Sequence, residues 1–425
     1  MILDRTTAPA FKPINKVTIP AISKEHLSNG IPVFSCNLPQ QEVLKIELVF
    51  EAGNVYAQEK GIGALFTKMM LTGTHTLSAQ EVVNQFDQWG GFAEFSQRTK
   101  RLHITVYGMT RFFEKYLQGI KEIVDHISFP EEELEIQKKI AIQSIHLSNE
   151  KPATIASRAF RKGVFGENHP YGKEIEESDV AAVSRDQLVS FHHKEVKPYQ
   201  YQIFLSGELP NNYHQSLEQI FGNEVLSQKT SAIINLTHSK GEKIIVEKKD
   251  NMQSTLRIGN LLFGRKHPDA VKFQVTNTIF GGYFGSRLMK NIREEKGFTY
   301  GISSGLIPVG NSGYFMIGSD VVKENTIATI KEIKKEIATL QNDKVTESEL
   351  EVVKNYMIGS FANGVNNSFD IMDKNQKIIL GDFPEDYYTN YINNIRSVTA
   401  EDVLKMSQQY LNYSDFFEVI VGEKL

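Results

Sequence analysis

The stretch "VSRDQLVSFHHKEVKPYQYQIFLSGE", residues 183–208, returns in related form as "VTAEDVLKMSQQYLNYSDFFEVIVGE", residues 398–423. The two stretches align without a gap. Each begins at a residue that can cap a helix, Ser184 or Thr399, and an acidic residue follows where a helix N-terminus favours negative charge. Each ends in an apolar, strand-like run followed by Gly-Glu. The match predicts that one helix-and-strand unit occurs twice in the chain.

A second pair of similar segments indicates that the whole chain is duplicated. "PEEELEIQKK" begins at Pro130 and "TESELEVVKN" begins at Thr346, in the same order and at nearly the same spacing as the first pair. Two repeats at one spacing are typical of a duplicated architecture. We therefore expect two homologous domains, residues 1–215 and 240–425, joined by a polar linker region, residues 216–239.

Strand and helix patterns alternate within each half. "LKIELVF" (44–50), "LHITVYG" (102–108) and "GYFMIGS" (313–319) alternate as half-buried strands do. "RFFEKYLQGIKEIVDHI" (111–127) instead repeats its apolar residues at the helical period. These patterns predict an α+β fold with two homologous domains, each a largely antiparallel sheet with helices packed on one face.

Composition excludes several classes of protein. The chain has 425 residues, of which 40% are hydrophobic and 23% charged, and its formal charge is −4, so no basic excess is available to bind nucleic acid. No window is apolar enough for a membrane span. The N-terminus shows no signal peptide, which predicts a cytoplasmic location, or a periplasmic one if a signal has been removed.

Cys36 is the single cysteine and is expected to be a buried thiol in an apolar strand, not a nucleophile.

Three longer segments resemble motifs of the pitrilysin/insulinase family of metallopeptidases. They are "EAGNVYAQEKGIGALFTKMMLTGT" (51–74), "FGENHPYGKEIEESDVAAVSRDQLVSFHHKEVKP" (165–198) and "IFGGYFGSRLMKNIREEKGFTYGISSG" (279–305). Mitochondrial processing peptidase subunits and two-subunit bacterial peptidases belong to this family. The resemblance implies that both halves are insulinase-like domains.

The family's zinc site is degenerate in this sequence. In the family, an inverted His-x-x-Glu-His places two zinc ligands on one helical face and a glutamate that activates water beside them. Aligned on Gly61 and on "MMLTGT", the three positions fall on Ala64, Thr67 and Lys68. Aligned on Pro152, the distal glutamate ligand falls on Ser144. Methyl, hydroxyl and ammonium groups do not hold zinc, so the resemblance implies that this chain binds no metal.

One other histidine pair has a superficial likeness to a metal motif. "HHKEV", residues 192–196, contains His-x-x-Glu but has Val196 where a second ligand is required. We interpret His192 and His193 as solvated residues on a surface helix.

The complementary part of the family's site is retained. Arg293 and Tyr300 have the separation of the family's Arg/Tyr pair, which implies that the arginine binds the substrate backbone and the tyrosine stabilises the oxyanion. From spacing alone, Arg293 could instead pair with Glu294, Glu295 or another surface carboxylate, and Tyr300 could cap a strand.

The glycines beside this pair do not form a phosphate site. Gly281, Gly282 and Gly285 do not follow a G-x-G-x-x-G pattern, and the lysine of a P-loop is missing. We expect a flexible turn before a helix, with Arg287 as a surface or helix residue.

The retained pair and the degenerate zinc motif together suggest a role in a complex. We interpret the chain as the non-catalytic, zinc-free subunit of a heterodimeric zinc metallopeptidase, inactive by itself. It would bind extended, unfolded peptide at a sheet edge and supply Arg293 and Tyr300 to a homologous, zinc-bearing partner. Two alternatives stay open, a structural core subunit of a larger complex and a homodimeric peptide-binding protein without peptidase activity. A hydrolase with another mechanism is disfavoured, because Cys36 is expected to be a buried thiol and not a nucleophile.

Overall fold

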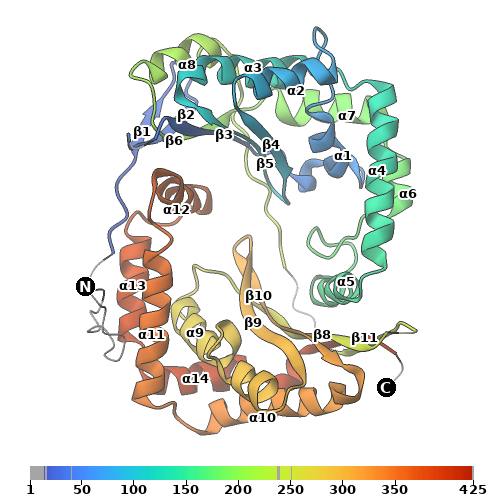
Figure 1. Ribbon diagram of the computed structural model, residues 1–425, viewed down its shortest axis with the longest axis vertical. Coiled ribbons are helices and arrows are strands. Elements are labelled where there is room, and N and C mark those ends of the chain that lie inside the picture. The colour runs from blue at the N-terminus through green and yellow to red at the C-terminus, as the bar shows by residue number, and fades with distance from the viewer. Residues whose placement is uncertain (1–13, 15–16, 40, 237–239, 250, 424–425) are drawn as a thin grey trace, which may run out of the picture.

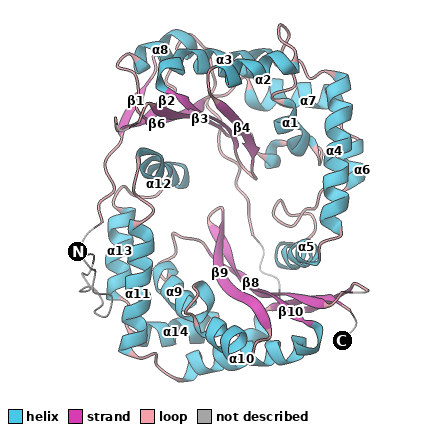
Figure 2. Ribbon diagram, viewed as in Figure 1, coloured by secondary structure: helices cyan, strands magenta, loops and turns pink. Residues whose placement is uncertain are grey.

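Two β-sheets, each covered by helices, form the upper and lower parts of the molecule in Figure 1. The computed structural model describes residues 14, 17–39, 41–236, 240–249 and 251–423. The N-terminal stretch on which the prediction about a signal peptide rests therefore lies largely outside the described residues. Figure 2 shows a sheet with helices packed against it in both parts, as expected for the predicted α+β fold.

The first sheet has the strand order β1-β2-β6-β3-β5-β4. Its strands are β1 (Ser23–His26), β2 (Pro32–Asn37), β3 (Val43–Phe50), β4 (Phe92–Gln97), β5 (Leu102–Met109) and β6 (Tyr201–Gly207). Strands β3 and β5 confirm the two strands predicted in this half. All neighbours pair antiparallel except β2 and β6, so the sheet is largely antiparallel, as predicted.

The helices of the first half, apart from α5, surround one hydrophobic core. The helices of this half are η1 (Asn54–Tyr56), α1 (Ile62–Met69), α2 (Ala79–Gln88), η2 (Thr110–Phe112), α3 (Phe113–His126), α4 (Glu131–Asn149), α5 (Pro152–Phe165), α6 (Glu177–Ala181), α7 (Arg185–Phe191), η3 (His192–Val196) and α8 (Tyr213–Phe221). Helix α3 confirms the helix predicted over 111–127. Its Tyr116 and Ile120 are buried in the same core as Leu44 and Ile46 of β3.

The second sheet has the strand order β7-β11-β8-β10-β9. Its strands are β7 (Lys243–Glu247), β8 (Gln253–Phe263), β9 (Thr299–Val309), β10 (Ser312–Val322) and β11 (Phe417–Gly422). Its helices are α9 (Ala270–Asn277), η4 (Thr278–Gly282), η5 (Met289–Glu295), η6 (Lys323–Asn325), α10 (Thr326–Asn342), α11 (Glu347–Ala362), α12 (Ser368–Gly381), α13 (Tyr387–Ser397), α14 (Ala400–Tyr410) and η7 (Tyr413–Asp415). Strand β10 contains the strand predicted at 313–319.

Five strands of the first sheet have the topology of the second sheet, and only β1 is extra, which confirms two homologous halves. Strand β6 lies between a parallel neighbour, β2, and an antiparallel one, β3, and β11 lies in the same way between β7 and β8. The aligned residues Leu205 and Ile420 face Ser35 and Ile245, respectively, on the parallel neighbour. Strands β5 and β4 continue the first sheet as β10 and β9 continue the second.

The predicted helix caps are also equivalent. The side chain of Ser184 accepts a hydrogen bond from the backbone N–H of Gln187 at the start of α7, and that of Thr399 accepts one from Asp402 at the start of α14. Each cap satisfies a backbone donor that the first turn of a helix leaves free.

Helix α8 crosses the predicted domain end at residue 215. Its Leu217 and Phe221 belong to the first hydrophobic core, so this part of the predicted linker packs with the first sheet. The domain boundaries at 215 and 240 stay a prediction.

Each sheet packs its own helices and, in addition, one helix from the other half. Helix α5 of the first half packs on β8 and β11, with Phe160 and Val164 against Phe417 and Val419. Helix α12 of the second half packs on β2 and β6, with Met372 near Phe204. Figure 1 shows α12 below the first sheet and α5 beside the second.

Burial on both faces corrects the expectation for β3. This strand was expected to be half-buried, but all residues from Leu44 to Phe50 are buried, including Lys45 and Glu47. The opposite face of the strand meets α12 and the space between the halves. Among the described residues, no helix combines the length and apolar character that crossing a bilayer requires.

Candidate functional site

Helix α1 carries the degenerate zinc positions. Its first turn follows Gly61, whose φ of +86° lies in the left-handed region that favours glycine. Leu65, Phe66 and Met69 are buried in the first core. Ala64 and Thr67 are partly buried and Lys68 is exposed, so these three positions lie on the face of α1 that turns away from the core.

The side chains at these positions do not fit zinc. Helix α1 packs against α4, which carries Ser144 as an exposed residue. The four positions therefore offer a methyl group, two hydroxyl groups and an ammonium, and the ammonium would repel a cation. Among the described residues there is no group of three or more His, Cys, Asp or Glu side chains that could hold a metal ion.

The "HHKEV" segment is only partly a surface feature. His193 is exposed as expected, but His192 is 2% exposed, which corrects the interpretation of this residue. Its ring packs against Phe66 and its Nε2 lies 2.6 Å from the carbonyl oxygen of Val124. Burial lowers the pKa of His192 to about 4, so the imidazole is neutral and donates to this carbonyl. Glu195 forms an ion pair with Lys229 at 2.7 Å.

The glycine-rich segment is held in place by a bidentate ion pair that the sequence did not suggest. Arg287 donates from Nε and Nη2 to the two carboxylate oxygens of Glu349 on α11, at 2.9 and 2.8 Å. A Cβ atom on Gly281 would lie 2.4 Å from Ser304 Oγ on β9, so glycine allows the backbone to approach the sheet closely. These contacts hold the backbone segment that leads into η5 in one position against α11 and β9.

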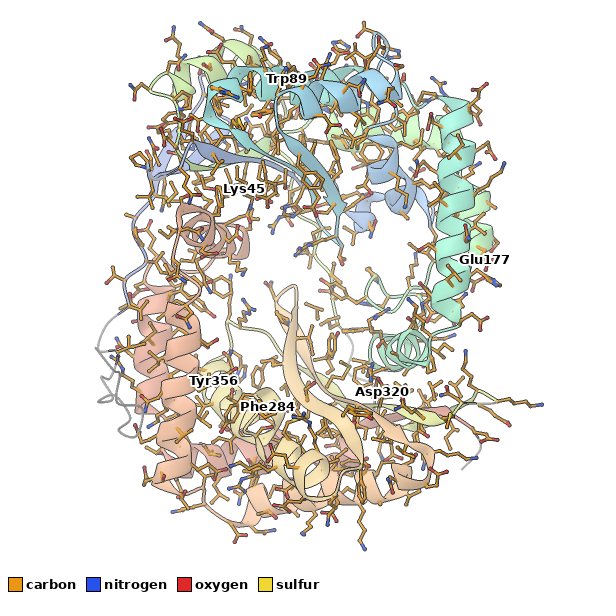
Figure 3. All side chains as sticks on the ribbon, in the orientation of Figure 1. Lys45, Trp89, Glu177, Phe284, Asp320 and Tyr356 are labelled. Atoms are coloured by element: carbon orange, nitrogen blue, oxygen red, sulfur yellow. The ribbon has the colours of Figure 1, made fainter. Side chains whose placement is uncertain are left out.

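Arg293 lies on η5 against an exposed aromatic ring. Its guanidinium carbon is 4.6 Å from the centre of the Phe284 ring, which is labelled in Figure 3 and is 65% exposed. Within the part of the chain that the structure describes, no carboxylate lies within ion-pair distance of Arg293. The alternative expectation of an ion pair with Glu294 or Glu295 is therefore not met, and the guanidinium fork remains available to a ligand.

Tyr300 follows Arg293 across a tight turn. Gly297 takes a φ of +66°, and the backbone N–H of Phe298 donates to the carbonyl of Ile292 at 3.0 Å. Tyr300 is 92% exposed, and its hydroxyl has no hydrogen-bond partner among the described residues. The side chain that caps the start of β9 is Thr299, not Tyr300: the Thr299 hydroxyl donates a hydrogen bond to the Asp320 carbonyl at 2.6 Å.

The two parts of the family's site lie in different halves of this chain. Helix α1 packs against α4, α6, α7 and β4, whereas η5 packs against β9 and α10. Figure 1 shows α1 in the upper part and β9 in the lower part. The sequence analysis predicted roles for Arg293 and Tyr300 but did not single out Phe284, which lies with Tyr283 between Gly282 and Gly285.

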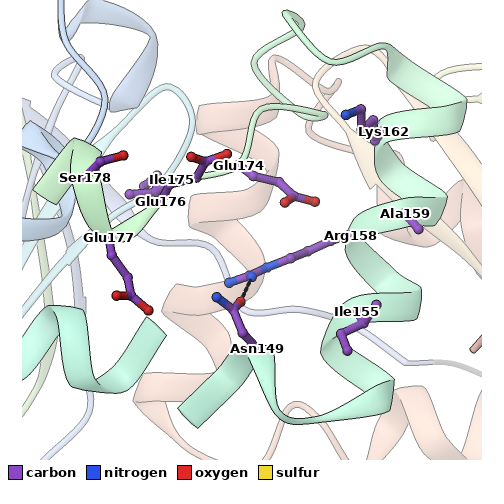
Figure 4. Close-up of a pocket in the computed structure, with 10 residues that line it drawn as sticks. All are labelled: Asn149, Ile155, Arg158, Ala159, Lys162, Glu174, Ile175, Glu176, Glu177 and Ser178. Atoms are coloured by element: carbon purple, nitrogen blue, oxygen red, sulfur yellow. Dashed lines mark hydrogen bonds between the residues drawn. The ribbon is translucent and has the colours of Figure 1, made fainter. Parts of the chain in front are cut away.

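A separate pocket of about 580 Å³ lies beside the end of α4, and Figure 4 shows its lining. Arg158 and Lys162 of α5 face Glu174, Glu176 and Glu177, and Arg158 is hydrogen-bonded to Asn149. Charges of both signs are interspersed there, and none of the predicted site residues lines the pocket.

Family models match both halves of the chain. Residues 32–176 match the model described as insulinase (peptidase family M16), and residues 182–357 match the model described as the peptidase M16 inactive domain. These two matches together span more than half of the chain.

Individual relatives agree with the family models. An uncharacterized zinc protease of Bacillus subtilis, YmxG, is 25% identical over 396 residues, covering 91% of this chain and 95% of the relative. A second Bacillus subtilis protein, described as a probable inactive metalloprotease, YmfF, is 22% identical over 251 residues, 57% of each chain. The crystal structure of a peptidase M16 inactive domain from Pseudomonas fluorescens shares the fold, with a TM-score of 0.85, 22% identity and coverage of 95% of this chain and 98% of that one. The chain belongs to the insulinase family of peptidases, family M16.

Proposed function

We propose that this chain is the non-catalytic subunit of a heterodimeric zinc peptidase and completes the active site of a homologous, zinc-bearing partner. The observation that carries this proposal is the state of Arg293 and Tyr300. Both side chains are free of ion pairs and hydrogen bonds within the described residues, and Tyr300 is 92% exposed. Side chains without partners in their own chain are available to bind a ligand or a partner subunit.

The two groups have complementary chemistry for peptide hydrolysis. A phenol hydroxyl donates one directed hydrogen bond, which stabilises the negative charge that develops on the carbonyl oxygen in the transition state. A guanidinium presents several N–H donors in one plane and can bind the carbonyl oxygens of an extended peptide. The ring of Phe284 under Arg293 limits the positions that this guanidinium takes. Zinc and the water-activating glutamate would come from the partner.

Both sheets offer an edge on which an extended peptide could bind. Strand β4 ends the first sheet and β9 ends the second, so among the described residues one side of each strand has no strand neighbour. Such edges bind peptides through main-chain hydrogen bonds with little demand on the peptide sequence. Tyr300 near the start of β9 would lie beside a peptide added there.

The test is a peptidase assay on an unfolded peptide with three samples. They are this chain alone, a zinc-bearing family member from the same organism alone, and the mixture. Activity in the mixture alone, lost on chelation of the partner's zinc, is expected. Tyr300→Phe in this chain should lower kcat of the mixture by about 10²-fold or more, because one oxyanion donor is removed. Tyr387→Phe, at a partly exposed tyrosine on α13 that packs on Phe383, is the matched control and should leave kcat unchanged.

Other results would select a different function. A stable complex without activity in any sample would favour the structural core subunit. A homodimer that binds peptide and does not associate with zinc-bearing family members would favour the peptide-binding protein. Chelator-sensitive activity of this chain alone would show that it holds a metal after all. The cytoplasmic location stays a prediction.

A further inference from the structure

A cavity of about 810 Å³ lies between the two halves of the chain. Its walls come from β3, β4 and β5 of the first sheet, from α12, from the turn between β9 and β10, and from the loop between β8 and α9, which carries Arg265 and Lys266. In Figure 1 the β9–β10 hairpin points toward the first sheet, and Figure 3 labels Lys45 on the side of that sheet that faces α12. None of the predicted zinc or Arg/Tyr positions lines this cavity.

Basic side chains dominate the lining of the cavity, seven to three over acidic ones. Some of the basic groups are neutralised by nearby carboxylates. Lys45 pairs with Glu47 and Asp373, at 3.1 and 2.9 Å. Arg101 pairs with Glu51 at 2.6 Å, and Lys266 pairs with Asp382 at 3.0 Å.

Four of the basic groups have no such partner. Within the described residues, no carboxylate lies within 4.0 Å of the charged groups of Arg98, Lys100, Arg265 and Lys377. Glu94 is the one lining carboxylate that is also without an ion pair there. The uncompensated charge of the lining is therefore strongly positive, although the chain as a whole has a formal charge of −4.

The excess of positive charge also affects the pKa of a neighbouring lysine, Lys374. Lys374 on α12 stacks over the rings of Phe361 and Tyr388, with its Nζ 4.8 and 5.7 Å from their centres. Burial lowers the pKa of Lys374, and the positive charges of Lys377 and Arg265 lower it further. Lys377 on α12 and Arg265 in the loop after β8, which are far apart in the sequence, therefore both make the electrostatic potential near Lys374 more positive.

The edge strand β4 leads directly into this region. Glu94, Ser96 and the following Arg98 line the cavity, at alternate positions as expected for one face of an extended segment. A peptide added along β4 would place every second side chain on the same face. Those side chains would lie opposite Arg98 and the cations of the second half.

From this arrangement we infer that the cavity receives an acidic segment of an extended peptide, whose carboxylates are attracted by Arg98, Lys100, Arg265 and Lys377. This inference rests on the proposed function, since it assumes that the chain binds peptides, and it adds a substrate class. Charged walls of one sign concentrate ligands of the opposite sign and select among them. Short acidic segments would therefore be preferred over neutral or basic ones of the same length.

The experiment uses the full chain and three labelled, unstructured peptides of equal length, in fluorescence anisotropy titrations. One peptide is rich in Glu and Asp, one has Gln and Asn at the same positions, and one has Lys. The acidic peptide is expected to bind most tightly, with an affinity that falls as salt rises. Arg265→Gln/Lys377→Gln should weaken its binding by roughly 3- to 10-fold and leave the neutral peptide unaffected.

Two further variants separate the cavity from the net charge of the chain. Glu94→Gln removes the unpaired carboxylate and should tighten binding of the acidic peptide. Lys139→Gln/Lys331→Gln removes the same number of charges at exposed positions outside the cavity and should leave binding unchanged. Folding of each variant is checked by circular dichroism.

Each remaining result contradicts the inference in a distinct way. Equal binding of all three peptides would leave the proposed function intact and overturn the preference for acidic segments. Binding of inorganic pyrophosphate without binding of the acidic peptide would show a small-anion site instead. Failure to bind any peptide, alone or mixed with a zinc-bearing family member, would overturn the inference together with the peptide-binding part of the proposed function.

Discussion

Lys45 on β3 and Asp373 on α12 form an ion pair between the two halves of the chain, with Nζ and Oδ1 2.9 Å apart. The Lys45 side chain is 9% exposed and also pairs with Glu47. Burial by itself would lower the pKa of Lys45, but the carboxylates of Glu47 and Asp373 outweigh burial and raise it. The lysine therefore stays charged and joins a sheet of the first half to a helix of the second.

The two partners of this ion pair should differ in their effect on stability. Lys45→Met leaves Glu47 buried with one partner fewer and should lower the free energy of unfolding by about 3 kcal/mol. Asp373→Asn removes a carboxylate that is 49% exposed, while Glu47 still neutralises Lys45, so a loss of about 1 kcal/mol is expected. Urea unfolding followed by circular dichroism measures both. Equal losses would mean that the pair acts as a unit.

Acid should destabilise the chain through Glu47. Burial raises the pKa of this carboxyl, but the hydrogen bond with His103 and the charge of Lys45 outweigh it and lower the pKa to about 2, below the ordinary value of 4.5. Because the folded state has the lower pKa, this stabilisation is complete above pH 4.5 and is lost as the pH falls toward 2. The loss is on the order of 3 kcal/mol.

Glu47→Gln is the control for this pH dependence. The variant should be less stable than the parent near neutral pH, and its stability should change less between pH 4.5 and 2. The measurement is urea unfolding at a series of pH values. A parallel acid dependence in both proteins would assign the effect to other carboxyl groups.

Removal of the contact between α5 and the second sheet should weaken both halves. Phe160 on α5 is fully buried against the second sheet, and Phe160→Ala should lower the free energy of unfolding by about 3–5 kcal/mol. Ile140→Ala on α4, at a side chain that is 48% exposed, is the matched control and should change it by less than about 0.5 kcal/mol. Limited proteolysis should cut the Phe160→Ala variant faster between the halves. Unchanged proteolysis would show that α5 does not hold them together.

Phe284 should position Arg293 if the proposed shared active site exists. Phe284→Ala removes a cation–π contact worth about 0.5–1 kcal/mol, so KM of the mixed peptidase should rise by roughly 2- to 5-fold with little change in kcat. Met252→Ala, at another exposed apolar side chain, serves as the control. Identical kinetics of the two variants would remove Phe284 from the binding surface.

Local features of this protein were determined by the sequence alone. The caps Ser184 and Thr399, the amphipathic helix α3 and the strands β3, β5 and β10 all follow from residues that are close in the chain. The internal repeat predicted two equivalent halves, because homologous sequences form homologous local structure. The role of Arg293 and Tyr300 stays a prediction, because it rests on the resemblance of their segment to the family's motif.

Contacts between distant segments were decided only by the tertiary structure. The pattern of "LKIELVF" predicts that one face of this strand is exposed to solvent, yet Lys45 and Glu47 on that face are buried. Their burial is possible because they form an ion pair with each other and because α12 of the other half places Asp373 next to Lys45. The sequence predicted His192 to be exposed, but the fold packs its ring against Phe66 and places its Nε2 within hydrogen-bond distance of the Val124 carbonyl. The positive cavity likewise combines Arg98 with cations of the second half. A sequence pattern reports the neighbours of a residue along the chain, whereas burial and electrostatic potential depend on the neighbours that the fold supplies.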